Sequence, residues 1–130
     1  MIAKVLHKDR LIIAVEINGK AANMLVDTGA SLSLIDIGRM KEYGFKKRTK
    51  LQGTISGIGG QQKEVWHTKD LDVKIQGIPL HQFVTTDISD VCESIRKATG
   101  ITVHGIIGLP QIKAAEMKID AENGIIKIGY

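Results

Sequence analysis

Alternating apolar and polar residues predict that most of this chain forms β-strands. Leu11 to Ile17 is a β-rich run, Asn18-Gly19 is a strong signal for a two-residue hairpin turn, and residues 20–26 return as the second arm. Residues 71–75 alternate strictly between apolar and charged side chains, as in a strand with one buried face. Near the end of the chain, Asn123-Gly124 predicts a closing hairpin whose last strand is rich in isoleucine.

A longer hairpin is expected between residues 54 and 67. Residues 54–56 lead into the glycine-rich segment Gly57-Ile58-Gly59-Gly60, and residues 61–67 lead away from it. After the strand at residues 71–75, Gly77 turns the chain and residues 78–85 continue as a strand.

Three short segments have the spacing or the end signals of helices. Asp36 is typical of a helix N-cap, and the helix that follows it ends at Gly44. From Ile88 to Ala98 apolar residues recur at helical spacing, and Gly100 closes the segment. A third helix is expected from Pro110 to about Met117.

Two parts of the chain repeat one another weakly. Ile17-Asn18-Gly19 begins a strand that ends at Asp27 and is followed by a helix. Ile75-Gln76-Gly77 begins a second strand that leads, after an interruption, to Ile106-Ile107-Gly108 and another helix. This pattern suggests duplicated halves.

Length and composition place the chain among globular proteins with one domain. Its 130 residues can enclose one core, and no apolar run is long enough to cross a bilayer. The start of the sequence lacks the apolar stretch of a secretory signal, and the single cysteine, Cys92, cannot form an internal disulfide. We therefore expect a cytoplasmic protein with no membrane partner. Cys92 falls on the apolar stripe of the expected helix, which favours a small buried residue over a catalytic thiol.

The charge of the chain is mildly basic, at +4. The densest basic run is Lys46 to Lys50, just after Tyr43 and Phe45. A phosphate-binding patch would need such charges on one face beside stacking aromatics, and aromatics make up only 4% of the chain. A solvated loop after the helix is the favoured interpretation, and no nucleic-acid partner is expected.

The histidines do not predict a metal site. His7, His67, His81 and His104 have no metal-ligand spacing between them, and no pair of Cys or His residues joins them. Each is expected to be a structural or surface histidine. We therefore expect neither a metal nor another cofactor.

Asp27-Thr28-Gly29 is the segment with the most evident chemistry. It follows two apolar residues, and an ionisable group directly after a buried strand is costly unless its surroundings serve it. Thr28 can hydrogen-bond across an interface, and Gly29 lets the backbone turn sharply and a substrate come close. The ordinary alternative is a strand that ends in an Asp-initiated turn. Leu25-Val26 before the segment and Ala30-Ser31 after it make the motif more specific.

This segment resembles the active-site loop of retroviral and retroviral-like aspartic proteases. Two further motifs agree with that resemblance in the right order. Ser56 to Gly60 is similar to the glycine-rich flap of retropepsins, and Gly105 to Gly108 resembles their apolar-apolar-Gly motif before the last helix. The closing segment from Met117 fits the hairpin of cellular and bacterial members. The likeness extends from about Leu11 to the end of the chain.

The resemblance implies a mostly β retropepsin-like acid protease barrel of one lobe, as a single aspartic protease domain over residues 1–130. It also implies a catalytic residue, an active-site loop, a flap that binds substrate, and a second loop that supports the site. In that order these are Asp27; Thr28, Gly29 and Ala30; Gly57, Ile58, Gly59 and Gly60; and Ile106, Ile107 and Gly108.

The implied mechanism needs two carboxylates, which lie too close together to ionise at once and therefore share one proton. The chain has one Asp-Thr-Gly, so a symmetric homodimer would supply the second aspartate. The implied activity is that of an aspartic endopeptidase acting on an extended polypeptide. The alternative is a non-proteolytic dimerisation or peptide-binding module on the same fold.

The sequence departs from the viral pattern in several places. Viral enzymes place an acidic residue and an arginine, which pair, where this chain has Ser31 and Leu109. Residues 86–104 contain a helical insertion that could shape either the cleft or the dimer interface. Ala30 lacks a hydroxyl that would stabilise an ionised carboxylate, so we expect activity at mildly acidic pH.

Overall fold

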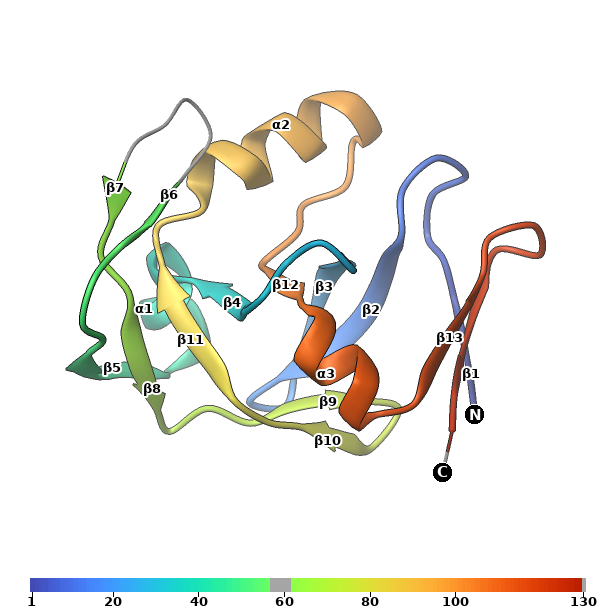
Figure 1. Cartoon of the computed structure of the whole chain (residues 1–130). Coiled ribbons are helices and arrows are strands. Elements are labelled where there is room, and N and C mark those ends of the chain that lie inside the picture. The colour runs from blue at the N-terminus through green and yellow to red at the C-terminus, as the bar shows by residue number, and fades with distance from the viewer. Residues whose placement is uncertain (57–61, 130) are drawn as a thin grey trace.

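The computed structural model describes residues 1–56 and 62–129, and strands form most of it (Figure 1). The strands are β1 (Ile2–Lys4), β2 (Ile12–Ile17), β3 (Lys20–Val26), β4 (Ser33–Asp36), β5 (Lys46–Lys50), β6 (Ile55–Ser56), β7 (Gln62–Lys63), β8 (Trp66–Lys69), β9 (Val73–Ile75), β10 (Ile78–Leu80), β11 (Phe83–Thr86), β12 (Gly105–Ile107), β13 (Met117–Asp120) and β14 (Ile125–Ile128). The helices are the 3₁₀ helix η1 (Ile37–Arg39), α1 (Met40–Tyr43), α2 (Ser89–Thr99) and α3 (Leu109–Ala114).

The main sheet has a symmetric centre. Within the described residues its strand order is β10-β9-β2-β3-β12-β4-β11-β8-β5. The two middle strands, β12 and β4, are antiparallel, while β3 pairs with β12 and β11 pairs with β4 in parallel. Parallel neighbours of this kind need crossover connections, which here bring distant segments of the chain together.

The weak repeat in the sequence has a structural counterpart at two tight turns. Asn18 and Gly19 both have positive φ, at 49° and 79°, and they join β2 to β3. Gln76 and Gly77 have nearly the same values, 48° and 84°, and they join β9 to β10. Two successive positive φ angles define the hairpin turn that matches the twist of antiparallel strands.

The chain ends form a smaller sheet of their own. Its order is β1-β14-β13, so the last strand lies between the first strand and its own hairpin partner. The amino terminus of Met1 donates a hydrogen bond to the carbonyl of Ile128 at 3.2 Å, so the first residue lies beside the end of the last strand (Figure 1). The closing hairpin was predicted from Asn123-Gly124, whereas β1 has only three residues and no sequence signal of its own.

Buried side chains form two clusters on opposite faces of the main sheet. Consecutive strand residues point to opposite faces, so Val26 joins the first cluster and Leu25 the second. In the same way Ile107 joins the first cluster and Ile106 the second. Helix α2 packs on the second cluster, which confirms the helical segment that was predicted there.

Cys92 of α2 is buried in the second cluster, as predicted. Burial raises the pKa of its thiol to about 12. The thiolate form is the nucleophile, so this cysteine is chemically inert near neutral pH.

Three of the expected elements differ in the structure. Lys46–Lys50 is strand β5 at the edge of the sheet, with all five residues exposed, and not a loop. Lysines are common on such edges because they prevent pairing with other chains, and the run shows no alternation because neither face is buried. The single strand expected at residues 78–85 is broken at Gln82, which has φ 66°. Helix α3 ends at Ala114, since Met117 already begins β13.

His104 is a buried structural histidine at the start of β12. Its ring contacts Tyr43 edge-on, with ring centroids 5.4 Å apart. Its Nδ1 accepts a hydrogen bond from the backbone N–H of Asn23 at 3.1 Å, and a nitrogen that accepts in this way carries no proton. Burial first, and then the charge of Arg39, lower the pKa of this imidazole from its ordinary value of 6.5.

None of the helices in the described part of the chain is both long enough and apolar enough to span a membrane.

The lowered pKa of His104 predicts a loss of stability in acid. Below pH 6.5 the unfolded chain binds the proton more readily than the folded chain, so the free energy of unfolding falls as the pH decreases. His104→Gln removes this contribution, and His81→Gln, at an exposed site, does not. Urea unfolding at pH 7 and pH 5 measures both. Equal pH dependence in the wild type and His104→Gln would contradict this assignment.

Candidate active site

Asp27 is held at the carboxyl end of β3 by two backbone hydrogen bonds and one hydrogen bond to its side chain. Its N–H donates to the carbonyl of Ile107 at 2.9 Å, and its own carbonyl accepts from Ala30 at 3.2 Å. Its carboxylate Oδ1 accepts from the N–H of Gly29 at 2.9 Å. The turn therefore holds the carboxylate close to an exposed stretch of backbone. Thr28 and Gly29 are exposed, and Asp27 and Ala30 are half-buried.

A second loop, at the end of β12, is joined to the first by direct contacts between backbones. The N–H of Gly108 donates to the buried Oγ of Ser33 at 2.9 Å, and the N–H of Leu109 donates to the carbonyl of Ala30 at 2.8 Å. A Cβ atom on Gly108 would lie 2.4 Å from the carbonyl oxygen of Leu32. Only glycine allows the two loops to approach this closely.

The three residues of the predicted second loop differ in what they contact. Ile107 is fully buried and holds the Asp27 backbone, and Gly108 makes the close contact with the first loop. Ile106 points the other way, into the second cluster beside Leu25.

The structure describes the base of the predicted flap hairpin. Strands β6 and β7 pair antiparallel, with Ile55 opposite Lys63 and Ser56 opposite Gln62. The expected flap residues Gly57, Ile58, Gly59 and Gly60 lie outside the described residues.

Lys63 connects the β6–β7 hairpin to helix α2. The ammonium of Lys63, with 14% of its side chain exposed, pairs with the carboxylate of Asp90 at 2.9 Å and donates to the carbonyl of Asp87 at 2.6 Å. The hydrogen bond from Lys63 lowers the pKa of Asp90. A hydrogen bond from the Ser89 hydroxyl likewise lowers the pKa of Asp87. The helical insertion thus contacts the β6–β7 hairpin on one side and the second cluster on the other.

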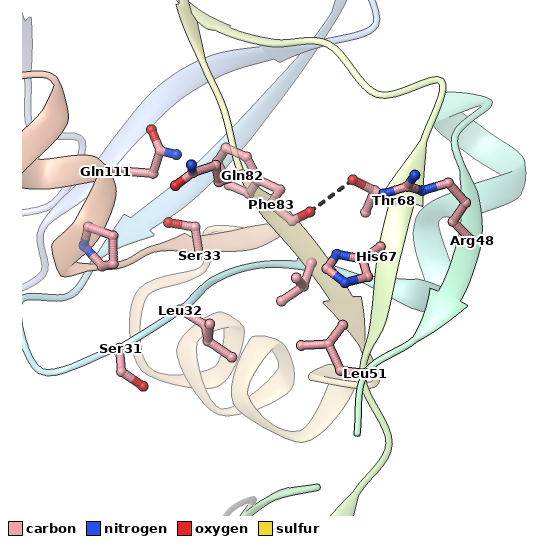
Figure 2. Close-up of a pocket in the computed structure, with 12 residues that line it drawn as sticks. Ser31, Leu32, Ser33, Arg48, Leu51, His67, Thr68, Gln82, Phe83 and Gln111 are labelled. Atoms are coloured by element: carbon pink, nitrogen blue, oxygen red, sulfur yellow. Dashed lines mark hydrogen bonds between the residues drawn. The ribbon is translucent and has the colours of Figure 1, made fainter. Parts of the chain in front are cut away.

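A pocket of about 540 Å³ opens beside the active-site loop (Figure 2). Its lining begins at Ser31, four residues after Asp27, and does not include Asp27 itself. Sequence reasoning did not find it, because its lining comes from segments between residues 31 and 111 that no local pattern connects. In the described part of the chain no group of three or more His, Cys, Asp and Glu residues is arranged to hold a metal ion.

Comparison with known proteins identifies the class that this fold and site define. The sequence profile described as aspartyl protease matches residues 13–110, a segment that contains both the Asp27 loop and the Gly108 loop. The chain belongs to this family. The search of curated protein sequences gave no match.

Three of the solved structures that are similar to the chain illustrate its fold. EIAV protease in complex with the inhibitor HBY-793 aligns over 85% of this chain and 92% of its own, with TM-score 0.60 and 24% identity. The retroviral protease-like domain of Ddi1 from Leishmania major aligns over 92% and 87%, with TM-score 0.60 and 20% identity. A retropepsin-like aspartic protease from Rickettsia conorii aligns over 100% and 89%, with TM-score 0.59 and 15% identity. The mostly β, retropepsin-like fold expected from the sequence is thereby confirmed.

Gly108→Ala should destabilise the protein strongly, because its Cβ would overlap backbone atoms that cannot move independently. We expect a loss of about 2 kcal/mol or more in the free energy of unfolding. Gly38→Ala is the matched control, since its Cβ would meet nothing closer than 3.5 Å. Thermal or urea unfolding measures both variants, and equal stabilities would contradict the close contact of the loops.

Proposed function

We propose that this protein is a homodimeric aspartic endopeptidase in which Asp27 and its copy in the partner chain activate a water molecule. Residues 1–130 form one protease domain in this proposal. The observation that carries it is the position of Asp27, whose carboxylate is fixed at the end of a strand by a loop joined to a second loop. Membership of the aspartyl protease family supports peptide hydrolysis as the reaction class.

One chain supplies only half of the catalytic pair. The sequence contains a single Asp-Thr-Gly, so two copies must bring their Asp27 loops together about a twofold axis. Thr28 is exposed on this loop, where its hydroxyl can hydrogen-bond across the interface. Ser31 and Leu109 cannot form the ion pair of the viral enzymes, so the dimer relies on other contacts.

The two aspartates divide the proton transfers between them. One carboxylate takes a proton from the water as its oxygen attacks the peptide carbonyl carbon. The other carboxyl group, which carries the shared proton, donates it to the carbonyl oxygen. The tetrahedral intermediate then breaks its C–N bond, and the leaving nitrogen takes a proton.

The substrate is an extended polypeptide that lies along the cleft as an added strand. Gly29 and Ala30 present backbone groups to it, and the segment Gly57 to Gly60 covers it as the flap. Ile106, Ile107 and Gly108 support the catalytic loop. Half-buried apolar side chains beside this loop favour apolar residues next to the scissile bond; they include Leu25, Ala30 and Leu32.

Asp27→Asn should abolish peptide cleavage while leaving the fold intact, because the side chain keeps its shape but loses the carboxylate. We expect kcat to fall by roughly 10³-fold or more. A diverse peptide library, assayed from mildly acidic to neutral pH, compares the wild type with this variant.

Two outcomes of that assay count against the proposal. Equal cleavage by both proteins would assign the activity to another site or a contaminant. If the wild type forms a folded dimer but cleaves no peptide at any pH, the result would instead favour the non-proteolytic peptide-binding module.

Ala30→Ser should extend activity to lower pH. A serine hydroxyl at this half-buried position can donate a hydrogen bond to an ionised carboxylate, which keeps that group charged in more acidic solution. The acidic limb of the pH–rate profile is expected to move downward, and Ala114→Ser on α3 serves as the control. An unchanged or upward-shifted limb in Ala30→Ser would contradict this role.

A further inference from the structure

The described residues that line the pocket beside the active-site loop include no Asp or Glu. Among the twelve described residues of its lining, Arg48 and His67 carry the basic groups. Arg48 from β5 and His67 from β8 form one end, and Ser33 from β4 and Gln111 from α3 lie toward the other (Figure 2). Every charged or titratable side chain in this lining is therefore a base.

Arg48 is one of two cations of β5 that form neither an ion pair nor a ring contact with a described residue, and the other, Lys46, does not line the pocket. Lys47 stacks over the ring of Trp66 at 4.5 Å, and Lys50 pairs with Glu64 at 3.0 Å. Arg48 makes no ion pair with any described residue, and it lies at the pocket. A guanidinium without a partner at the edge of a pocket favours a carboxylate ligand, which it can bind through two parallel hydrogen bonds.

Two buried polar groups face the other end of the pocket. Gln111 is 4% exposed, and its Oε1 accepts from the N–H of His81 at 3.3 Å, but its Nε2 donates to none of the described residues. Ser33 is 2% exposed, and its Oγ accepts from Gly108, which leaves the hydroxyl hydrogen available to donate. No buried side-chain nitrogen or oxygen of the described residues lacks a hydrogen-bond partner, so the amide nitrogen of Gln111 is accessible at the pocket. Both groups can therefore donate to a ligand with acceptor oxygens.

Apolar side chains form another part of the pocket wall. Leu32, Leu51, Val84 and Pro110 offer surface for methylene groups. A glutamate side chain combines such a stem with a carboxylate, and the peptide carbonyls next to it supply the acceptors for Ser33 and Gln111.

We propose that this pocket is a subsite that selects an acidic side chain, preferably glutamate, in the extended polypeptide bound by the protein. The proposal rests on the proposed protease function. Arg48 and His67 bind the carboxylate, and Ser33 and Gln111 bind backbone carbonyl oxygens of the same peptide. Because the lining starts beyond Asp27, the selected residue lies away from the scissile bond.

The test compares peptides that differ only by Glu or Gln. A cleaved library peptide is resynthesised with Glu or Gln at each position up to four residues from the scissile bond. At one position we expect Glu to raise kcat/KM by about tenfold, as a charge-assisted hydrogen bond would. High salt should weaken this preference. Arg48→Gln should abolish it, and Lys41→Gln, an equal change of charge at an exposed site on α1, should not.

The outcomes separate the subsite from the protease function. Cleavage without a Glu preference at any position, or a preference that survives Arg48→Gln, overturns the subsite and leaves the protease intact. If the wild type cleaves nothing, binding of Glu and Gln peptide pools to Asp27→Asn is measured by fluorescence anisotropy. Tighter binding of the Glu pool that requires Arg48 then supports the subsite alone, and equal or absent binding overturns it.

Discussion

The contact between the Asp27 loop and the Gly108 loop is the constraint on which the rest of the structure depends. These loops end two parallel strands, β3 and β12, and they touch backbone to backbone because Gly108 has no side chain. The carbonyl of Ile107 fixes the Asp27 backbone, and the carbonyl of Ala30 fixes Leu109. The N–H of Gly29 in turn holds one oxygen of the Asp27 carboxylate, so the two loops together define where this side chain lies.

Sequence patterns predicted the parts of the fold that local chemistry decides. Asn18-Gly19 and Asn123-Gly124 form turns that reverse the chain tightly with residues at positive φ, and Asn and Gly adopt this conformation most readily. The apolar spacing of α2 predicted a helix because one face of this helix is buried. The patterns failed where tertiary pairing decides. Lys46 to Lys50 forms a strand only because β8 lies beside it, and β1 exists only because β14 provides hydrogen bonds.

The sequence likewise predicted the two loops of the candidate site but not the pocket beside them. Asp27 and Gly108 stand in motifs whose residue types carry the chemistry, and the structure brings their loops together. The pocket beside them has no motif, since Arg48, His67 and Gln111 come from separate elements. The sequence predicted the insertion as a helix, but only the structure reveals that Lys63 connects the β6–β7 hairpin to it through Asp90. Long-range contacts of this kind leave no local signal in a sequence.

The central claim is that two Asp27 carboxylates from two chains form one active site. The most direct test mixes wild type with Asp27→Asn, lets the subunits exchange, and follows cleavage at constant total protein. If both carboxylates are required, activity varies with the square of the wild-type fraction, and an equal mixture keeps about a quarter of the activity. Activity proportional to the wild-type fraction, with about half remaining in the equal mixture, would contradict the account.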